Sequence, residues 1–351
     1  MLRYIVNKLL YGILVLVLVV VGVSAIVFLA PVDPAQLTFG QRSDVSTVQA
    51  KSTELGLDQP LHVQLWRYLG DLSPVSVLEN TPENKHKYRF ITLWEKANNK
   101  VLVLKTPYLR ESYQSGRPVS EVLAEAIPPT ALLAGAAMLL ATLLGISMGV
   151  LSALKPNSWI DRITSVVSVL GYSLPSYVVA VFFALVLGYW LSDFTGLEVQ
   201  GSLYVLDDFG DWQVRWRNMI LPVLALGLRP VALVTQLTRS AMLEVLSQDY
   251  VRTAHAKGLS NMRVWLRHAL RNALNPVVSA LSGWFAALLT GAFFVENVFN
   301  FKGLGSVTVA ALLQFDVPVV LGCVLFTSAV FVIINLLVDM VYVWIDPRVK
   351  L

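Results

Sequence analysis

Between two very apolar segments the chain carries a polar and basic stretch, QDYVRTAHAKGL, at residues 248–259. The run from about 243 to 257 contains good helix formers and no Gly or Pro, which predicts a single helix. Gly258 directly follows Lys257, and Gly after a basic last turn is a common end of a helix because it adopts positive φ at low cost. Ser260 is then expected to cap a second helix.

The second predicted helix is amphipathic. Its apolar residues recur at helical spacing and its arginines form the opposite stripe: Met262, Trp265, Leu266, Ala269, Leu270 and Ala273 against Arg263, Arg267 and Arg271. The pattern predicts a helix, a glycine turn and a second helix, all lying along the cytoplasmic face of a membrane. Periodicity alone is equally compatible with a basic loop that rests on anionic lipid.

The residue string favours a more specific interpretation. DYVRTAHAKGLS at 249–260, followed by LRHALRNAL at 266–274, resembles the cytoplasmic EAA loop of ABC-importer permeases in the oligopeptide, dipeptide and nickel branch. The general pattern has Glu-Ala-Ala before its glycine, whereas this chain has RTA at 252–254, a departure typical of the peptide branch. The resemblance implies that the loop couples to an ATPase through Tyr250, Arg252, Thr253, Ala254, Lys257 and Gly258.

Three further strings extend the resemblance over nearly the whole chain. They are LGLDQPL at 55–61, VENVFNFKGLG at 295–305, which matches a VE-x-VF-x-x-x-GLG element, and the DPR ending at 346–348. The segment at about 74–107 has no counterpart in the family pattern. The resemblance therefore implies the B-type transmembrane subunit of a peptide importer.

Composition supports a polytopic membrane protein. Of 351 residues 56% are hydrophobic and only 14% are charged, whereas a soluble domain has about a quarter charged. The net charge of +4 is modest, and the basic residues gather in short loops, so they indicate membrane topology and not nucleic-acid binding. The single cysteine, Cys323, lies in an apolar run and is expected to be a small filler.

The expected fold is an all-α polytopic membrane protein with the six helices of a type I ABC-importer permease. Apolar runs predict spans at about 9–30, 128–154, 163–191, 219–241, 274–295 and 317–345. A cleaved signal peptide is the alternative for the first run, but its length favours an uncleaved span within residues 1–31. The excess of Lys and Arg in the short segments assigned to the inside places both termini in the cytoplasm of a bacterial inner membrane.

Residues 32–125 are polar and are expected outside the membrane. Tyr88 to Trp94 and Lys100 to Lys105 are β-prone with Asn98-Asn99 between them, which predicts a β-hairpin within the 74–107 insert. The insert could contact a substrate-binding protein, but surface loops tolerate insertions well, so a decorative loop is the favoured interpretation. Before it, about 47–72 predicts two short helices broken at Gly56.

The remaining core, 126–346, contains the coupling loop at 243–273 and precedes a cytoplasmic tail at 347–351. Arg229 lies about half-way across the fourth span, and an arginine there should face a cavity or a partner because lipid exposure is costly. GYSLPS at 171–176 interrupts the third span, as is tolerated where helices pack or line a cavity. Arg229, Ser173 and Pro175 are therefore the candidate residues of a translocation path.

Several chemistries lack a signature in the sequence. There is no G-x-x-x-x-G-K-[ST] phosphate loop, and the four histidines form no zinc pattern, so no cofactor or metal is expected on this chain. The resemblance implies ATP and Mg on two ATP-binding partner subunits. It also implies a homologous C-type permease and an extracytoplasmic binding protein, with no nucleic acid among the partners.

Three alternatives remain for the function. An importer of nickel, glutathione or antimicrobial peptides in the same branch has nearly the same sequence pattern. A secondary transporter acting alone should show inverted repeats and several charges inside the membrane, yet only Arg229 and Asp339 stand out. A scaffold without transport activity leaves the specific string at 253–258 without a role.

Overall fold

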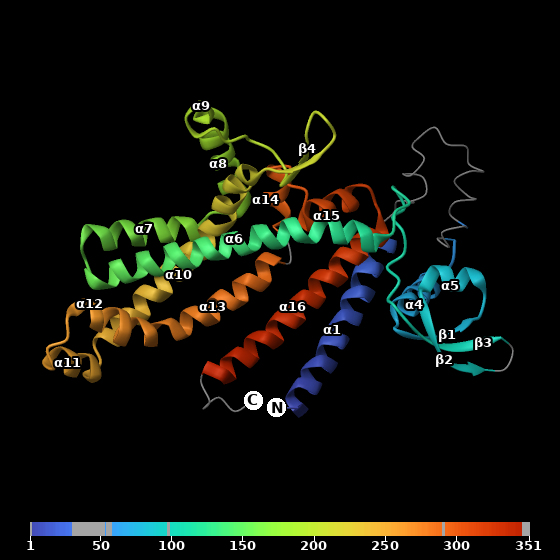
Figure 1. Ribbon diagram of the computed structural model, residues 1–351, viewed down its shortest axis with the longest axis horizontal. Helices are drawn as coiled ribbons and strands as arrows, with labels where there is room; N and C mark the ends of the chain where they lie inside the picture. The colour runs from blue at the N-terminus through green and yellow to red at the C-terminus, as the bar shows by residue number, and fades with distance from the viewer. Residues whose placement is uncertain (1, 30–52, 54–57, 97–98, 290–291, 346–351) are drawn as a thin grey trace. The chain divides into compact units, whose positions relative to one another are not determined.

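Helices dominate the computed structural model, which describes residues 2–29, 53, 58–96, 99–289 and 292–345 (Figure 1). Among these residues four helices are long and apolar enough to cross a membrane, and six spans result if each of two bent helix pairs counts as one. Two small antiparallel sheets complete the structure. The predicted fold class, a polytopic helical membrane protein with a β-hairpin, is confirmed.

The chain forms two compact units. The larger comprises Met1–Gly12, Ala126–Val307 and Thr327–Leu351, and the smaller comprises Ile13–Glu125 and Thr308–Phe326. The helices that contribute to both are α1 (Leu2–Leu29), α6 (Val119–Leu154), α15 (Leu304–Leu313) and α16 (Val317–Ile345).

The larger unit is built around helix α10 (Ile220–Leu246), which follows the short 3₁₀ turn η2 (Trp216–Met219). Helix α10 packs against α7 (Trp159–Ser173), α8 (Ser176–Phe183) and α13 (Arg271–Leu289) (Figure 1). The other elements of this unit are η1 (Ala184–Trp190), α9 (Ser192–Thr195), β4 (Tyr204–Leu206), β5 (Trp212–Val214), α11 (Asp249–Ala256), α12 (Asn261–Arg263), η3 (Val264–Leu270) and α14 (Phe293–Val298).

Small residues bring α6 and α10 into close contact. A Cβ on Gly145 would lie 2.6 Å from Val234 Cγ1, and one on Gly149 would lie 2.6 Å from Thr238 Cβ. These two glycines form a G-x-x-x-G spacing, which places both on one face of α6. The small residues in this span thus allow the two helices to approach closely. Such close packing stabilises helix contacts in a membrane, where lipid supplies no hydrophobic driving force between helices.

The third predicted span is broken. Helices α7 and α8 meet at an angle of 109° across Leu174 and Pro175. Leu174 is extended, with φ −76° and ψ 134°, because the ring of the following proline disfavours helical geometry in the residue before it. Pro175 also lacks the N–H that would continue the ladder, so the helix ends here and a new one begins at Ser176.

Two other span boundaries differ from the prediction. The sequence places the start of the second span at Pro128 and Pro129, whereas α6 begins at Val119 and contains both prolines. The carbonyls of Ala124 and Glu125 lose their helical donors there, but both residues are exposed, so water can satisfy them. The predicted fifth span is divided between α13, which bends by 46°, and α14.

The smaller unit contains a three-stranded sheet of order β1-β3-β2 next to a short helix (Figure 1). Its elements are α4 (Leu61–Leu72), β1 (Val75–Glu79), α5 (Pro82–Tyr88), β2 (Phe90–Lys96) and β3 (Lys100–Lys105). The predicted hairpin is confirmed as β2 and β3, and Asn99 has a φ of 56°, as such a turn requires. The sequence did not indicate β1 or α5. The first of the two short helices predicted before this sheet falls mostly outside the described residues.

Buried charges connect this sheet to α4. The Nζ of Lys105 donates to the carbonyls of Gly70 and Asp71, at 2.8 and 2.9 Å. The Asp71 carboxylate in turn accepts from the Tyr88 hydroxyl and from Arg110 Nε, both at 2.8 Å. Burial lowers the pKa of Lys105, and Asp71 acts in the opposite direction. The insert is therefore bonded to the preceding helix and is not a free-standing loop.

Candidate functional site

The predicted coupling loop contains a helix that ends as the sequence predicts. Helix α11 is followed by Gly258, whose φ is +75°. The Gly258 N–H donates to the carbonyl of His255 at 2.9 Å, and the Leu259 N–H donates to the carbonyl of Ala254 at 3.4 Å. This pair of bonds is a Schellman motif, in which a left-handed residue closes the helix end and satisfies carbonyls that would otherwise lack donors.

One apolar cluster holds this motif against the rest of the loop. Val251 and Ala254 are buried against Val264, with Leu246 and Leu259 partly buried at the edge. Ala254 was expected to contact the ATPase, but its side chain is only 8% exposed and packs inside the loop, so it does not lie on the exposed face of α11. Its small side chain instead allows α11 to approach the second helix of the loop.

The other predicted coupling residues are exposed. Arg252, Thr253 and Lys257 lie on the solvent side of α11, and Tyr250 is 42% exposed, with its hydroxyl accepting from Asn272 Nδ2 at 2.9 Å. Arg252 contacts Asp249 one turn earlier at 3.5 Å, in a pair that is open to solvent. This face of α11 is thus polar, basic and available for contact.

The single helix predicted from 243 to 257 is wrong. Helix α10 ends at Leu246, and α11 begins at Asp249 after an extended Gln248 with a ψ of 149°. The Ser247 hydroxyl donates to the carbonyl of Glu244 at 2.7 Å. Such a local bond competes with the helical ladder, and Asp249 in the first turn of α11 favours a new helix start.

The apolar stripe predicted for the second helix is also partly wrong. Met262 and Leu266 are exposed, whereas Val264 and Ala269 are buried. The segment η3 is a π-helix, in which hydrogen bonds connect residues five apart. The buried pair has this spacing of five. The stripe drawn at 3.6 residues per turn is therefore correct at Ala269 and Ala273, which are buried, but it omits Val264 and wrongly includes Met262 and Leu266. Arg263, Arg267 and Arg271 are exposed as expected, and Ser260 occupies the N-cap position without a side-chain cap bond.

Arg229 lies between two aromatic rings from different helices. Its guanidinium carbon is 5.1 Å from the ring centre of Tyr172 on α7 and 5.8 Å from that of Trp284 on α13. Gly171 permits this approach, because a Cβ there would lie 3.3 Å from both Ala232 Cβ and Leu228 Cγ on α10. The site therefore combines a cation with two π faces, a favourable arrangement.

The other candidate path residues flank the helix break. Ser173 ends α7 and Pro175 precedes α8, and both are exposed. Ser173 follows Tyr172 directly, so the break lies next to the aromatic contact of Arg229. Sequence reasoning identified the cation and the break but missed both aromatic residues, since nothing in the spacing of Tyr172 and Trp284 indicates that they meet.

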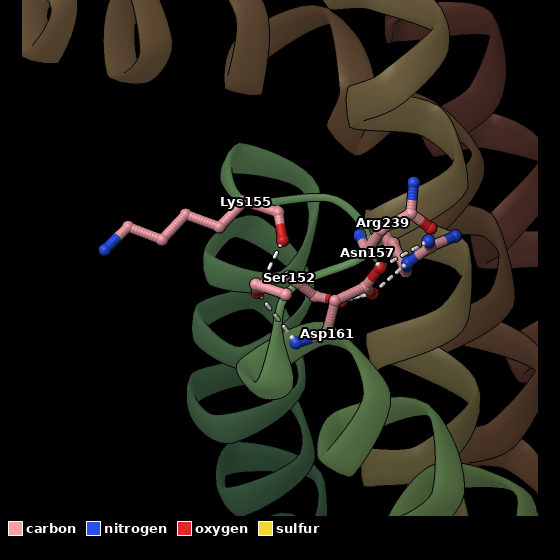
Figure 2. Close-up of polar contacts among 6 residues, drawn as sticks. Ser152, Lys155, Asn157, Asp161 and Arg239 are labelled. Atoms are coloured by element: carbon pink, nitrogen blue, oxygen red, sulfur yellow. Dashed lines mark hydrogen bonds and ion pairs between the residues drawn. The ribbon is translucent and has the colours of Figure 1, made fainter.

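A second arginine contact, which is partly buried, was missed entirely. Arg239 on α10 donates from Nε and Nη2 to the two carboxylate oxygens of Asp161, at 2.6 and 2.8 Å (Figure 2). The same carboxylate accepts from the Ser152 hydroxyl of α6 and from the Asn157 N–H at 2.8 Å. Asp161 on α7 thereby connects α6 and α10, at a point seven residues before α10 ends. The Lys155 side chain points away from this cluster (Figure 2).

The acidic residue noted in the last span is paired. Asp339 forms an ion pair with Lys8 and accepts a hydrogen bond from the Tyr4 hydroxyl at 2.9 Å. The negative charge of Asp339 is therefore offset within the chain.

The GLG element also has a structural basis. Glu296 is fully buried and accepts from the Thr130 hydroxyl at 2.8 Å and from the Ser306 N–H at 3.0 Å. A Cβ on Gly303 or Gly305 would lie 2.6 or 2.9 Å from the Glu296 carboxylate oxygen Oε2. The glycines therefore let the backbone wrap this buried acid, a role that the sequence did not reveal.

No group of three or more His, Cys, Asp or Glu side chains could hold a metal ion within the described part of the chain. Cys323 is fully buried, in agreement with its expected role as a filler.

Comparison with known proteins places these features in a family. The family model described as binding-protein-dependent transport system inner membrane component matches residues 141–351, and that of the N-terminal part of such components matches 1–134. The glutathione transport system permease protein of Salmonella paratyphi A is 35% identical over 350 residues, covering 100% of this chain and 99% of that protein. The probable D,D-dipeptide transport system permease protein of Escherichia coli K12 is 36% identical over 356 residues, covering 95% and 94%.

The fold has a counterpart among solved structures. An inward-facing form of the MetNI methionine ABC transporter aligns with a TM-score of 0.50 at 16% identity, covering 63% of this chain and 94% of that one. Both family models and the full-length relatives agree with the resemblance seen in the coupling loop. The chain belongs to the family of inner membrane components of binding-protein-dependent transport systems.

Proposed function

We propose that the chain is a permease subunit of an ATP-driven importer and that its substrates are peptides. The observation that carries the proposal is the coupling loop, where a short helix is closed by Gly258 and presents Arg252, Thr253 and Lys257 to solvent. An exposed, locally closed helix is suited to bind in a groove of another protein. The peptide substrate is supported by relatives named for glutathione and D,D-dipeptide transport.

In this proposal the ATPase partner performs the hydrolysis, with ATP and Mg, and this chain transmits the resulting movement. Closure of two ATP-binding subunits would tilt α11. The buried cluster around Val251 and Val264 would pass the tilt to η3 and α13, because these residues pack as one body. A second permease of the same fold and an extracytoplasmic binding protein complete the proposed assembly.

The proposed topology has both termini in the cytoplasm and residues 32–125 outside, with 126–346 as the transport core. A cysteine at Lys257 should be labelled by impermeant maleimide only after cells are opened, and one at Thr92 should be labelled in intact cells. Both variants need a Cys323→Ser background. Labelling of position 257 in sealed cells would overturn the topology.

Transport itself can be tested with the complete assembly in proteoliposomes. Peptide uptake should require ATP inside the compartment that holds the ATPases, and it should stop when either ATPase or binding protein is omitted. Uptake by this chain alone would instead identify a secondary transporter.

Nickel, glutathione and antimicrobial peptides remain alternatives within the same branch. Competition of labelled glutathione or nickel against peptide uptake distinguishes them. The nickel alternative gains no support from the residues that the structure describes, which contain no candidate metal cluster.

A further inference from the structure

Arg229 is embedded in an apolar span. It follows the first residue of α10 by nine positions, about 14 Å at 1.5 Å per residue, and it precedes Leu246 by about 26 Å. Its neighbours in sequence, Leu228 and Pro230, are apolar, and the helix around it is long and hydrophobic enough to cross a membrane. A guanidinium at this depth costs several kcal/mol unless an anion, water or polar groups compensate.

Two other charged pairs of the larger unit are neutralised within the chain. Arg239 has a bidentate partner in Asp161, and Asp339 is paired with Lys8. Across the described residues no acidic side chain forms an ion pair with Arg229, and the residue is exposed. Within the described residues its charge is thus not neutralised by the chain itself and is open to an anionic group from outside it.

The aromatic contacts orient this free charge. Tyr172 and Trp284 lie 5.1 and 5.8 Å from the guanidinium carbon and come from two helices, α7 and α13, that each pack against α10. The faces of the two rings stabilise the cation. The N–H groups of the guanidinium lie in its plane and stay available to donate hydrogen bonds. The site therefore holds a planar fork of donors in place, and that geometry matches a carboxylate in a bidentate contact.

We propose that Arg229, held between Tyr172 and Trp284, binds the C-terminal carboxylate of the transported peptide as it crosses the membrane. The inference rests on the proposed function, since peptides supply the anion. A peptide carries a carboxylate at its C-terminus whatever its side chains are, so one arginine serves many sequences. The contact offsets the cost of bringing the carboxylate into the apolar region.

Kinetics of the complete transporter test the role of the charge. The probe is an equimolar panel of alanine peptides of two to five residues, presented with saturating binding protein and quantified inside proteoliposomes by mass spectrometry. Arg229→Gln should lower the maximal uptake rate about tenfold or more, while the half-saturating concentration changes less than about twofold, because the binding protein sets the latter. Arg229→Lys should be intermediate, since it keeps charge but loses the fork.

The aromatic contacts need their own variants and a matched control. Tyr172→Leu and Trp284→Leu should each lower the maximal rate about threefold, with Tyr172→Phe near the parent, because only the ring face contacts the cation. Arg162 is the matched control: it lies 5.9 Å from the ring of Trp159 and is exposed at the start of α7. Arg162→Gln should leave uptake unchanged.

Photocrosslinking shows which end of the peptide meets the site. A dialanine-based tripeptide with photoleucine at its C-terminus should label the segments around Tyr172 and Trp284, and Arg229→Gln should remove that label. The same tripeptide with photoleucine at its N-terminus should not label them. Labelling that is equal for both probes, or that survives Arg229→Gln, would overturn the proposal.

Two outcomes separate this inference from its premises. If the parent transporter imports no peptide while importing another substrate, the proposed function fails and the inference fails with it. If parent uptake is normal but Arg229→Gln either transports fully or loses the partner permease on purification, the proposed function stands. Full transport by Arg229→Gln would place Arg229 outside the translocation path. Loss of the partner permease would show that Arg229 pairs with that subunit. Either result overturns the proposed carboxylate site.

Discussion

The coupling turn at 249–259 and the α4–sheet region at 61–110 are both polar segments in an apolar chain, yet their charged side chains differ in burial and in bonding. In the α4–sheet region Lys105 is 4% exposed and bonded to two carbonyls, and Asp71 accepts two hydrogen bonds from the same region. On α11 the side chains of Arg252 and Asp249 are 76% and 96% exposed and form an ion pair with each other at 3.5 Å.

The difference separates stabilising charges from available ones. An ion pair as exposed as Arg252–Asp249 contributes little to folding, about 0.3–0.5 kcal/mol. The fold of the coupling turn depends instead on a small apolar cluster and one glycine. Changes to buried residues should therefore disrupt each region, whereas changes to the exposed face of α11 should affect only what binds there.

The largest effect is expected from Ala254→Glu. A carboxylate would enter the cluster with Val251 and Val264 without a partner, at a cost of several kcal/mol. Amides of α11 should lose hydrogen-exchange protection about a hundredfold or more, and ATPase association should fall. Ala256→Glu is the matched control, since Ala256 is exposed on the same helix and its amide protection should not change. Equal protection in the two variants would show that the cluster does not hold the helix.

A smaller effect is expected from Asp71→Asn. The change weakens the charge-assisted hydrogen bonds that Arg110 and Tyr88 donate to Asp71. It should lower the free energy of local unfolding by about 2 kcal/mol, which raises the equilibrium constant for local opening roughly thirtyfold. Hydrogen exchange of β2 and β3 should accelerate accordingly while exchange of α11 is unchanged. Glu95→Gln is the control, because Glu95 is exposed on β2. If Asp71→Asn left the sheet as protected as Glu95→Gln does, the buried charges would not be stabilising.

The smallest effect on stability, but a clear one on coupling, is expected from Gly258→Val. A Cβ on Gly258 meets no atom within 4 Å, so the cost comes from the φ of +75° alone, about 1–2 kcal/mol. Protein level should stay normal while peptide-stimulated ATP hydrolysis falls several-fold. Gly258→Asn should retain most activity, because Asn tolerates this conformation. Equal loss of ATP hydrolysis in both variants would show that position 258 must lack any side chain, and that the backbone conformation is not the cause.

The sequence was most informative where one residue determines the local backbone. Gly258 predicted positive φ, and the Asn98-Asn99 pair in the sequence predicted a chain reversal between the two β-prone runs, because few residue types allow these conformations. The apolar spans were equally predictable, since the membrane imposes their length and composition.

The sequence was least informative where distant residues meet or where the helical period changes. Asp161 and Arg239 are 78 residues apart, and no local signal connects them. The π turn of η3 shifts the buried face of the second loop helix, and periodicity analysis assumes a constant period. The cluster of Ala254 illustrates the same limit: a small residue on an amphipathic helix fits a docking face and an intrachain contact equally well.

The central claim is that the exposed face of α11 binds an ATPase subunit, and disulfide cross-linking tests it most directly. Cysteines at Thr253 and at Lys257, each in a Cys323→Ser background, lie on that face. In an assembled transporter that imports peptide, each should form a cross-link to an ATPase that carries cysteines along its surface groove, and a cysteine at Thr92 should form none. The absence of any cross-link from positions 253 and 257 in an assembled and active transporter would contradict the account.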